Sequence, residues 1–154
     1  MNARRVYLDS SALLKRYVLE KGTEEVERLF RDAYSKRVVL IMSAWNLGEA
    51  VGVLDRKRRR GDMEDDVFNS LKVALLGDVK RMVALGIMKL VPVHTMLLVT
   101  AWELIEKHHV YQADALQIAS ARYESAQEFY TADRKLHAVA LAEGLNSILL
   151  GVDG

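Results

Sequence analysis

The sequence contains no cysteine. Disulfide frameworks and thiolate zinc sites are therefore excluded, because both require cysteine sulfur. It also lacks an apolar run long enough to cross a bilayer: the best candidate, residues 90–102, is too short and contains Pro92 and His94. The N-terminal residues lead directly into an expected strand, without the apolar segment of a secretion signal. We therefore expect a cytoplasmic protein that does not associate with membranes.

Neither sign of charge is in excess. The 22 Lys and Arg residues nearly cancel the 21 Asp and Glu residues, which leaves a formal net charge of +1. This balance neither indicates nor excludes nucleic acid as a partner, so only the placement of charges along the chain is informative. Hydrophobic residues make up 51% of the 154 residues, and no linker, repeat or low-complexity segment divides them. We expect a single domain over residues 1–154 with a sizeable core.

Strand and helix patterns alternate along the chain. The expected strands cover residues 5–9, 38–42, 89–93, 128–132 and 147–150. Ser10 or Ser11 is expected to cap the first helix, and Gly22 to end it in a left-handed conformation. Regular alternation of this kind predicts a three-layer α/β/α fold, in which helices cover both faces of a parallel sheet.

Three later positions are expected to mark helix boundaries. Ser43 is expected to cap the helix that follows the second strand, and Asp62 is the expected cap of the next helix. Gly77, followed by an aspartate, is a candidate break within that helix.

Four acidic residues fall at strand ends or early in helices. Asp9 and Asp133 each close an expected strand, and ligands bind beyond the carboxyl ends of parallel strands, so both can face one crevice. Glu49 can reach the same edge, because helical side chains tilt toward the helix N-terminus. Asp114 lies in the first turn of a helix, where an isolated aspartate usually only complements the helix dipole. The convergence of all four acids is what predicts a site.

Such a convergence has an electrostatic consequence. Two carboxylates about 4 Å apart repel each other by about 4 kcal/mol at an effective dielectric near 20. A divalent cation removes this conflict, and oxygen ligands without cysteine favour Mg²⁺ or Mn²⁺. Because these ions bind phosphate oxygens and activate water, the expected reaction is hydrolysis of a phosphodiester.

Four segments resemble, in order and spacing, the motif regions of PIN-domain ribonucleases: VYLDSSALLKRY, SAWNLGEAV, YQADALQIASA and FYTADRKLHAVALAEGL. The similarity is strongest to the VapC-type toxins of toxin–antitoxin pairs. It implies a five-stranded parallel sheet of order 3-2-1-4-5, metal-dependent cleavage of RNA, a homodimer and a small inhibitory antitoxin.

The resemblance also implies roles for individual residues. The acidic quartet and a hydroxyl two residues before its last member correspond to Asp9, Glu49, Asp114, Asp133 and Thr131. Many family members have asparagine where this chain has Ser11. That departure leaves the implied metal ligands intact.

A run of cations over residues 56–60 is expected either to contact the RNA backbone or to form a solvated helix end that complements the dipole. The residues expected to contact RNA are basic or carry a hydroxyl: Ser10, Arg56, Arg58, Arg59 and Arg134. His108 and His109 point in different directions on a helix, so we expect a helix-end role and not metal binding. No basic–aromatic alternation surrounds Trp45 or Trp102, which favours the core or an interface over base stacking.

Three other functions fit parts of this pattern. A phosphatase with an aspartyl nucleophile typically has a second acid two residues later, where this chain has Ser11. A PIN-fold nuclease of RNA processing or decay, acting without an antitoxin, would need the same acids. A non-catalytic module that binds RNA or protein is disfavoured by the intact quartet.

Overall fold

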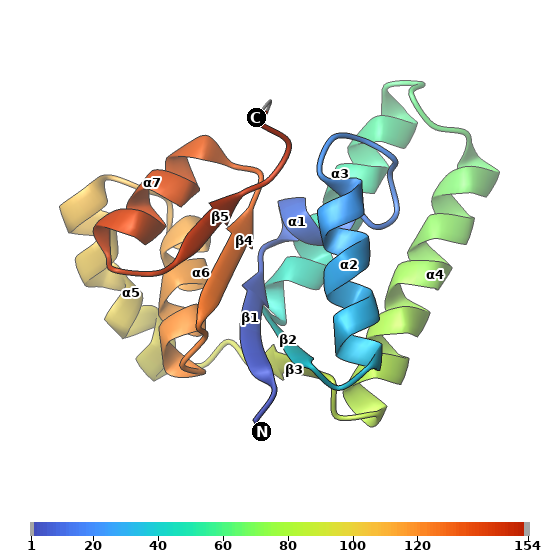
Figure 1. The fold of residues 1–154 in the computed structure, drawn as a ribbon. Helices are drawn as coiled ribbons and strands as arrows, with labels where there is room; N and C mark the ends of the chain where they lie inside the picture. Colours follow the sequence, from blue (N-terminus) through green and yellow to red (C-terminus); the bar gives the residue numbers. More distant parts are fainter. Residues whose placement is uncertain (1, 153–154) are drawn as a thin grey trace.

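The computed structural model describes residues 2–152. Five parallel strands form one sheet in the order β3-β2-β1-β4-β5 (Figure 1). The strands are β1 Arg4–Leu8, β2 Val38–Ser43, β3 Met88–Val91, β4 Glu128–Thr131 and β5 Ser147–Leu149. Both the positions of the strands along the chain and the order implied by the resemblance are confirmed.

Seven helices occupy the described part of the chain: α1 Ser10–Leu14, α2 Thr23–Tyr34, α3 Trp45–Arg59, α4 Asp65–Ala84, α5 Thr95–His108, α6 Gln112–Tyr123 and α7 Arg134–Ala142. Helices α1 to α4 cover one face of the sheet and α5 to α7 the other (Figure 1). Because successive strand residues point to opposite faces, Val6 and Leu8 enter the first core and Tyr7 the second. The expected three-layer architecture is confirmed. No described helix combines the length and the apolar character needed to cross a bilayer.

The expectation for the ends of α1 was wrong. Asp9, and neither Ser10 nor Ser11, occupies the N-cap and accepts a hydrogen bond from the Ala12 N–H at 2.8 Å. The helix ends after a single turn at Leu14. The acid that closes β1 is therefore held by the start of the helix that follows it.

Gly22 does not end α1 but occupies the N-cap of α2, with φ of +93°. A Cβ atom there would lie 2.9 Å from Cδ of Lys15 and 3.1 Å from the Gly151 nitrogen. Glycine is required because the chain both turns with positive φ and approaches a buried lysine closely.

Two other helix boundaries also differ from expectation. Glu64, and not Asp62, is the N-cap of α4, and Gly77 does not break this helix, which runs for 20 residues. An interior glycine costs about 1 kcal/mol relative to alanine. Burial of Leu75 and Met82 in the first core outweighs that cost. At the start of α3, Ala44 is the N-cap, while the Ser43 hydroxyl accepts a hydrogen bond from the Trp45 N–H at 3.2 Å.

Candidate active site

The carboxylate of Asp9 lies where β1 and β4 end side by side. Leu8 pairs with Tyr130, so the next residue of each strand, Asp9 and Thr131, meet at the carboxyl edge of the sheet. Asp9 is only 4% exposed. Its oxygens accept hydrogen bonds from the Ser11 hydroxyl at 2.6 Å, from the Ala12 N–H and from the Thr131 hydroxyl. These donors fix the orientation of the carboxylate.

Burial raises the pKa of Asp9 above its usual range. The hydrogen bonds from Ser11, Thr131 and Ala12 oppose this rise, whereas the negative charge of Asp133 adds to it. Hydrogen bonds therefore orient the ionised Asp9 carboxylate, but burial removes most of the water that would solvate its charge. A cation beside it would stabilise that form.

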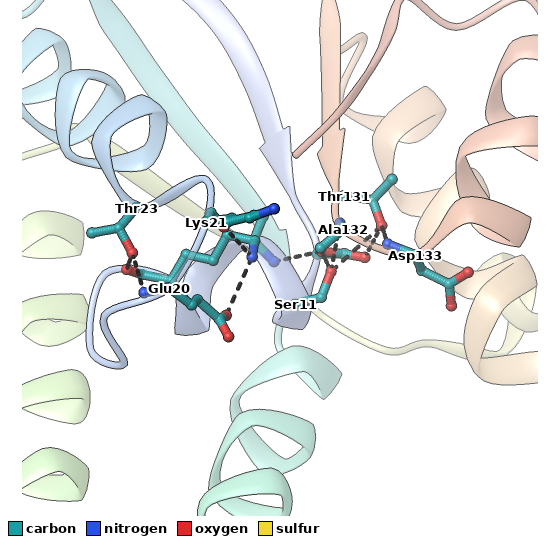
Figure 2. Close-up of polar contacts among 10 residues, drawn as sticks. Ser11, Glu20, Lys21, Thr23, Thr131, Ala132 and Asp133 are labelled. Atoms are coloured by element: carbon teal, nitrogen blue, oxygen red, sulfur yellow. Dashed lines mark hydrogen bonds and ion pairs between the residues drawn. The ribbon is translucent and has the colours of Figure 1, made fainter. Parts of the chain in front are cut away.

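Two hydroxyl groups connect Asp9 to the loop that carries Asp133. The Ser11 Oγ accepts a hydrogen bond from the Ala132 N–H at 2.9 Å, and the Thr131 Oγ1 accepts one from the Asp133 N–H at 3.0 Å (Figure 2). Each hydroxyl thus donates to Asp9 and accepts from the β4–α7 loop. The arrangement sets the spacing between the first and last acids of the quartet.

The other acids come from three different helix starts or turns. Asp133 is the exposed N-cap of α7, where it accepts a hydrogen bond from the Leu136 N–H at 3.1 Å. Glu49 is half-buried on α3, and Asp114 is half-buried in the first turn of α6.

Burial raises the pKa of both half-buried acids. For Glu49 the charges of Asp9 and Asp114 add to the rise, and hydrogen bonds from Trp45 and Ser10 oppose it. For Asp114 the charge of Asp133 adds to it, and Lys135 opposes it. Asp9 therefore repels Asp133 and Glu49, and Asp114 repels the same two residues. We call these four acids the acidic ring.

Among residues 2–152, no Lys or Arg forms an ion pair with any of the four acids, although the charge of Lys135 opposes the rise in the pKa of Asp114. Over the same residues, no three Asp, Glu or His side chains lie close enough together to hold one metal ion directly. Mg²⁺ usually takes one or two carboxylates and keeps several water molecules, so this spacing suits it better than a closed set of protein ligands. The oxygen-only donors fit Mg²⁺ or Mn²⁺.

A buried polar network beneath the acids was not anticipated from the sequence. The Tyr7 hydroxyl donates to Oε1 of Gln117 and accepts a hydrogen bond from the Ser43 N–H at 3.2 Å. Nδ2 of Asn46 donates to the Leu8 carbonyl at 3.0 Å. These side chains are almost completely buried. The network therefore joins β1, β2, α3 and α6 at the edge of the sheet that carries the acids.

Each member of this network shares a face with one acid. Tyr7 lies two residues before Asp9 on a strand, and Gln117 lies three residues after Asp114 on α6. Asn46 has the same three-residue spacing from Glu49 on α3. A polar residue at such a spacing, on an otherwise apolar helix face, is the sequence signal that could have found these positions.

A cavity of about 370 Å³ adjoins Ser10 and Ser11. Its cationic residues are Lys15, buried on the α1 side, and Lys57 from the last turn of α3. The Lys15 ammonium donates to the Lys21 carbonyl at 2.6 Å and lies 3.3 Å from the Glu20 carboxylate. The sequence reasoning missed Lys15, since a single lysine after an apolar segment usually marks a solvated position.

The basic run at the end of α3 is already partly engaged. Arg58 forms an ion pair with Asp55 at 2.5 Å and lies 4.2 Å above the Phe68 ring, and Arg59 pairs with Asp55 at 3.1 Å. Arg56 is exposed. Contact of this run with RNA therefore stays a prediction, as it does for Arg134, which is exposed at the start of α7.

The structure also bears on the expectations for the two adjacent histidines and for the two tryptophans. His108 pairs with Glu143 at 3.0 Å and His109 ends α5 with φ of 53°, so both histidines have helix-end roles. Trp45 and Trp102 are 50% and 54% exposed, so neither lies in the core, and the alternative of an interface stays a prediction for both. Each tryptophan lies at a helix position whose neighbours, and not the tryptophan, fill the core.

Comparison with curated proteins finds no significant match. A family model described as the PIN domain matches residues 6–142. Among solved structures, VapC20 of Mycobacterium tuberculosis, described as a sarcin–ricin loop cleaving toxin, is 20% identical with a TM-score of 0.63, over 91% of this chain and 95% of that one. PAE2754 of Pyrobaculum aerophilum is 16% identical with a TM-score of 0.63, over 94% and 89% of the two chains.

FitAcB of Neisseria gonorrhoeae is 16% identical with a TM-score of 0.64, over 93% of this chain and 96% of that one. At these identities the structures share the fold, and they establish no activity for this chain. The family match begins within β1, spans β2, β3 and β4 and includes all four acids of the ring. The chain therefore belongs to the PIN-domain family.

Proposed function

We propose that this chain is a metal-dependent endoribonuclease that hydrolyses RNA phosphodiester bonds with Mg²⁺ or Mn²⁺. The observation that carries the proposal is the ring of four mutually repelling carboxylates at one sheet edge, without an ion-pair partner in the described part of the chain. A structural role would not require such a ring, because unpaired like charges destabilise the folded state.

Within this site, Asp9 and Asp133 would hold the ion, and Asp114 and Glu49 would complete its surroundings. The ion would supply Lewis-acid stabilisation of the phosphate and a water molecule activated for attack. Ser11 and Thr131 hold the Asp9 carboxylate in one orientation. Glu49, whose pKa burial raises, is placed to accept a proton at its carboxylate.

We further propose that the protein is the toxin of a VapBC-type pair and acts as a homodimer in the cytoplasm. The motif resemblance supports this, as does the fold shared with VapC20, described as a toxin. The expected antitoxin is a short chain with apolar residues for a groove beside α3, where Trp45 would form one wall. It would place an Arg or Lys near Asp9 and Asp114, since a guanidinium can bind two carboxylate oxygens.

Replacement of Asp9 tests the nuclease. Asp9→Asn should abolish RNA cleavage, and EDTA should do the same to the unmodified protein until Mg²⁺ or Mn²⁺ is added back. In thermal melts, the metal-free variant should be as stable as the parent chain or more so, because one repelling charge is gone. Mg²⁺ should raise the melting temperature of the parent chain only. Undiminished cleavage by Asp9→Asn would refute the mechanism.

The toxin assignment requires a separate experiment. The chain is purified from its native host, and any small protein encoded beside it is titrated into the cleavage reaction. Inhibition at a fixed stoichiometry supports the pair. An active nuclease that no neighbouring small protein binds or inhibits would instead be an enzyme of RNA processing or decay.

A further inference from the structure

A small apolar pocket adjoins the acidic ring on the side of α5 and α6. Its volume is about 170 Å³, and its walls are formed by Trp45, Val93, Leu98, Gln112, Ala113 and Leu116. None of these residues belongs to the ring or to the cavity that contains Lys15 and Lys57. The pocket is thus a separate feature of the same sheet edge.

Two of its walls are directly connected to acids of the ring. Trp45 precedes Glu49 by four residues on α3, so the two side chains share one face of the helix. Ala113 is the residue before Asp114 in the first turn of α6. A group bound in the pocket would therefore lie beside a phosphodiester held at the acids.

The exposed surface of the pocket is aromatic and apolar. Trp45 is 50% exposed and Val93 39% exposed, and no Lys or Arg contributes to the walls. The pocket therefore cannot bind a phosphate through charge. Because half of the Trp45 side chain is exposed, its ring is the aromatic surface that this pocket offers to a ligand.

One polar group accompanies this aromatic face. The side-chain amide of Gln112 has no hydrogen-bond partner within residues 2–152 and is exposed at the first residue of α6. An aromatic face and a free amide are the two groups by which proteins recognise an unstacked base of single-stranded RNA: the ring stacks and the amide bonds to the base edge.

We propose that this pocket binds one nucleobase of the RNA strand, stacked on Trp45 with its edge toward the Gln112 amide, next to the phosphodiester at the acidic ring. This inference rests on the proposed ribonuclease function and names the part of the substrate that the enzyme recognises. No basic–aromatic alternation surrounds Trp45 along the chain, because the proposed recognition surface is assembled from α3, α5 and α6 and not from one segment.

The test uses a short fluorescein-labelled single-stranded RNA of mixed sequence, bound to Asp9→Asn protein so that it is not cleaved. Trp45→Ala should weaken binding by roughly 5- to 150-fold, the range that corresponds to a stacking contribution of about 1–3 kcal/mol. Trp45→Phe keeps an aromatic face, so it should retain most of the affinity. Trp102→Ala is the matched control, since it removes an equally exposed tryptophan that does not line the pocket.

An abasic nucleotide, moved along the RNA, identifies the base concerned. At one position it should weaken binding to the parent protein, and there Trp45→Ala should cause no further loss. Gln112→Ala should reduce discrimination among bases at that position only. The proposal is overturned if Trp45→Ala and Trp102→Ala have the same effect, if no abasic position couples to Trp45, or if Trp45→Ala dissociates an oligomer, which would make the pocket an interface between copies.

Cleavage by the parent chain separates this inference from the proposed function. If the parent chain cleaves RNA with Mg²⁺ while Trp45→Ala binds RNA with unchanged affinity, the base pocket is wrong and the nuclease stands. If the parent chain neither binds nor cleaves RNA, both fail.

Discussion

At the scale of single residues, the hydroxyl of Thr131 connects the first and last acids of the site. It donates to Asp9 and accepts from the Asp133 N–H, so it contacts both strand-end acids. It is fully buried, which leaves water no access to replace it. The hydrogen bond to Asp9 also lowers the pKa of that carboxyl against the effect of burial.

Thr131→Val should therefore reduce turnover by about 10- to 100-fold, the usual effect of removing a group that orients a metal ligand. In the proposed mechanism, activity needs the ionised Asp9 and should be lost as the pH falls through its pKa. Removal of a hydrogen bond that lowers this pKa should move the acidic limb of the kcat/KM profile to higher pH. Thr131→Ser keeps the hydroxyl and should retain the parent profile. An unmoved limb in Thr131→Val would show that Thr131 does not tune Asp9.

At the scale of strands and helices, buried polar contacts hold together the elements that carry the acids. Tyr7 on β1 bonds to Gln117 on α6 and to the backbone of β2, while its ring stacks on Phe129 at a centroid distance of 5.2 Å. Burial raises the pKa of the Tyr7 hydroxyl far above its usual range, so the group stays protonated and donates.

Tyr7→Phe should lower the free energy of unfolding by about 1–3 kcal/mol, because Gln117 and the Ser43 N–H lose a buried partner while the ring stays in place. Urea denaturation measures this change. Tyr17→Phe is a suitable comparison, since its hydroxyl bonds to Asp78 in a less buried position and its loss should cost less. An equal loss in the free energy of unfolding for Tyr7→Phe and Tyr17→Phe would mean that the buried network beneath the acids stabilises the fold no more than a partly exposed hydrogen bond does.

Helices α5, α6 and α7 are joined by a second polar cluster. Glu143 accepts hydrogen bonds from Lys107, His108 and Arg122, which come from α5 and α6. The bond from Lys107, followed by those from His108 and Arg122, lowers the pKa of Glu143 to about 2, although burial opposes the shift. Because the folded state favours the ionised form, this stabilisation is present above the usual pKa of 4.5 and is lost as the pH falls from there toward about 2.

Glu143→Gln should therefore destabilise the protein by about 1–3 kcal/mol at neutral pH. The difference from the parent chain should shrink as the pH falls below 4.5. Thermal melts over a pH series measure it. Glu106→Gln changes an exposed glutamate without an ion pair in the described part of the chain and should have little effect. A stability difference between Glu143→Gln and the parent chain that stays the same at low pH would contradict stabilisation by the ionised Glu143 carboxylate.

At the scale of the whole molecule, the acidic ring and the basic run of residues 56–60 occupy different regions. The ring of carboxylates lies at the sheet edge, and the basic run ends α3, where Lys57 reaches the cavity beside Ser10 and Ser11. RNA that spans both regions would bind through the cations and react at the acids. Such binding should weaken as the salt concentration rises, because each phosphate contact releases counterions.

Arg56→Gln should reduce the slope of log affinity against log salt by about 0.7 if Arg56 contacts one phosphate of a single strand. Base preference should not change. Arg58→Gln should in addition lower the free energy of unfolding, because Arg58 pairs with Asp55 and packs on Phe68. Binding titrations over a salt series, on the Asp9→Asn background, measure the slopes. Unchanged slopes for both variants would assign the run to a solvated helix end.

The sequence by itself determined the strands, the alternation with helices and the placement of Asp9 and Asp133 after two strand ends. Apolar runs and helical spacing are local properties, so they can be read without knowing what each element packs against. The order of the strands came from the family resemblance, which carries tertiary information that periodicity lacks.

Tertiary structure alone decided how the acids are supported and what surrounds them. Gly77 does not break α4 because the helix is held by the core beneath it, and Trp45 is exposed because its neighbours on α3 fill that core. Lys15 is buried by the turn at Gly22, and Gln117 finds its partner on β1, 110 residues earlier in the chain. Periodicity reports which side of an element faces inward, whereas hydrogen bonds between distant elements exist only once the chain has folded.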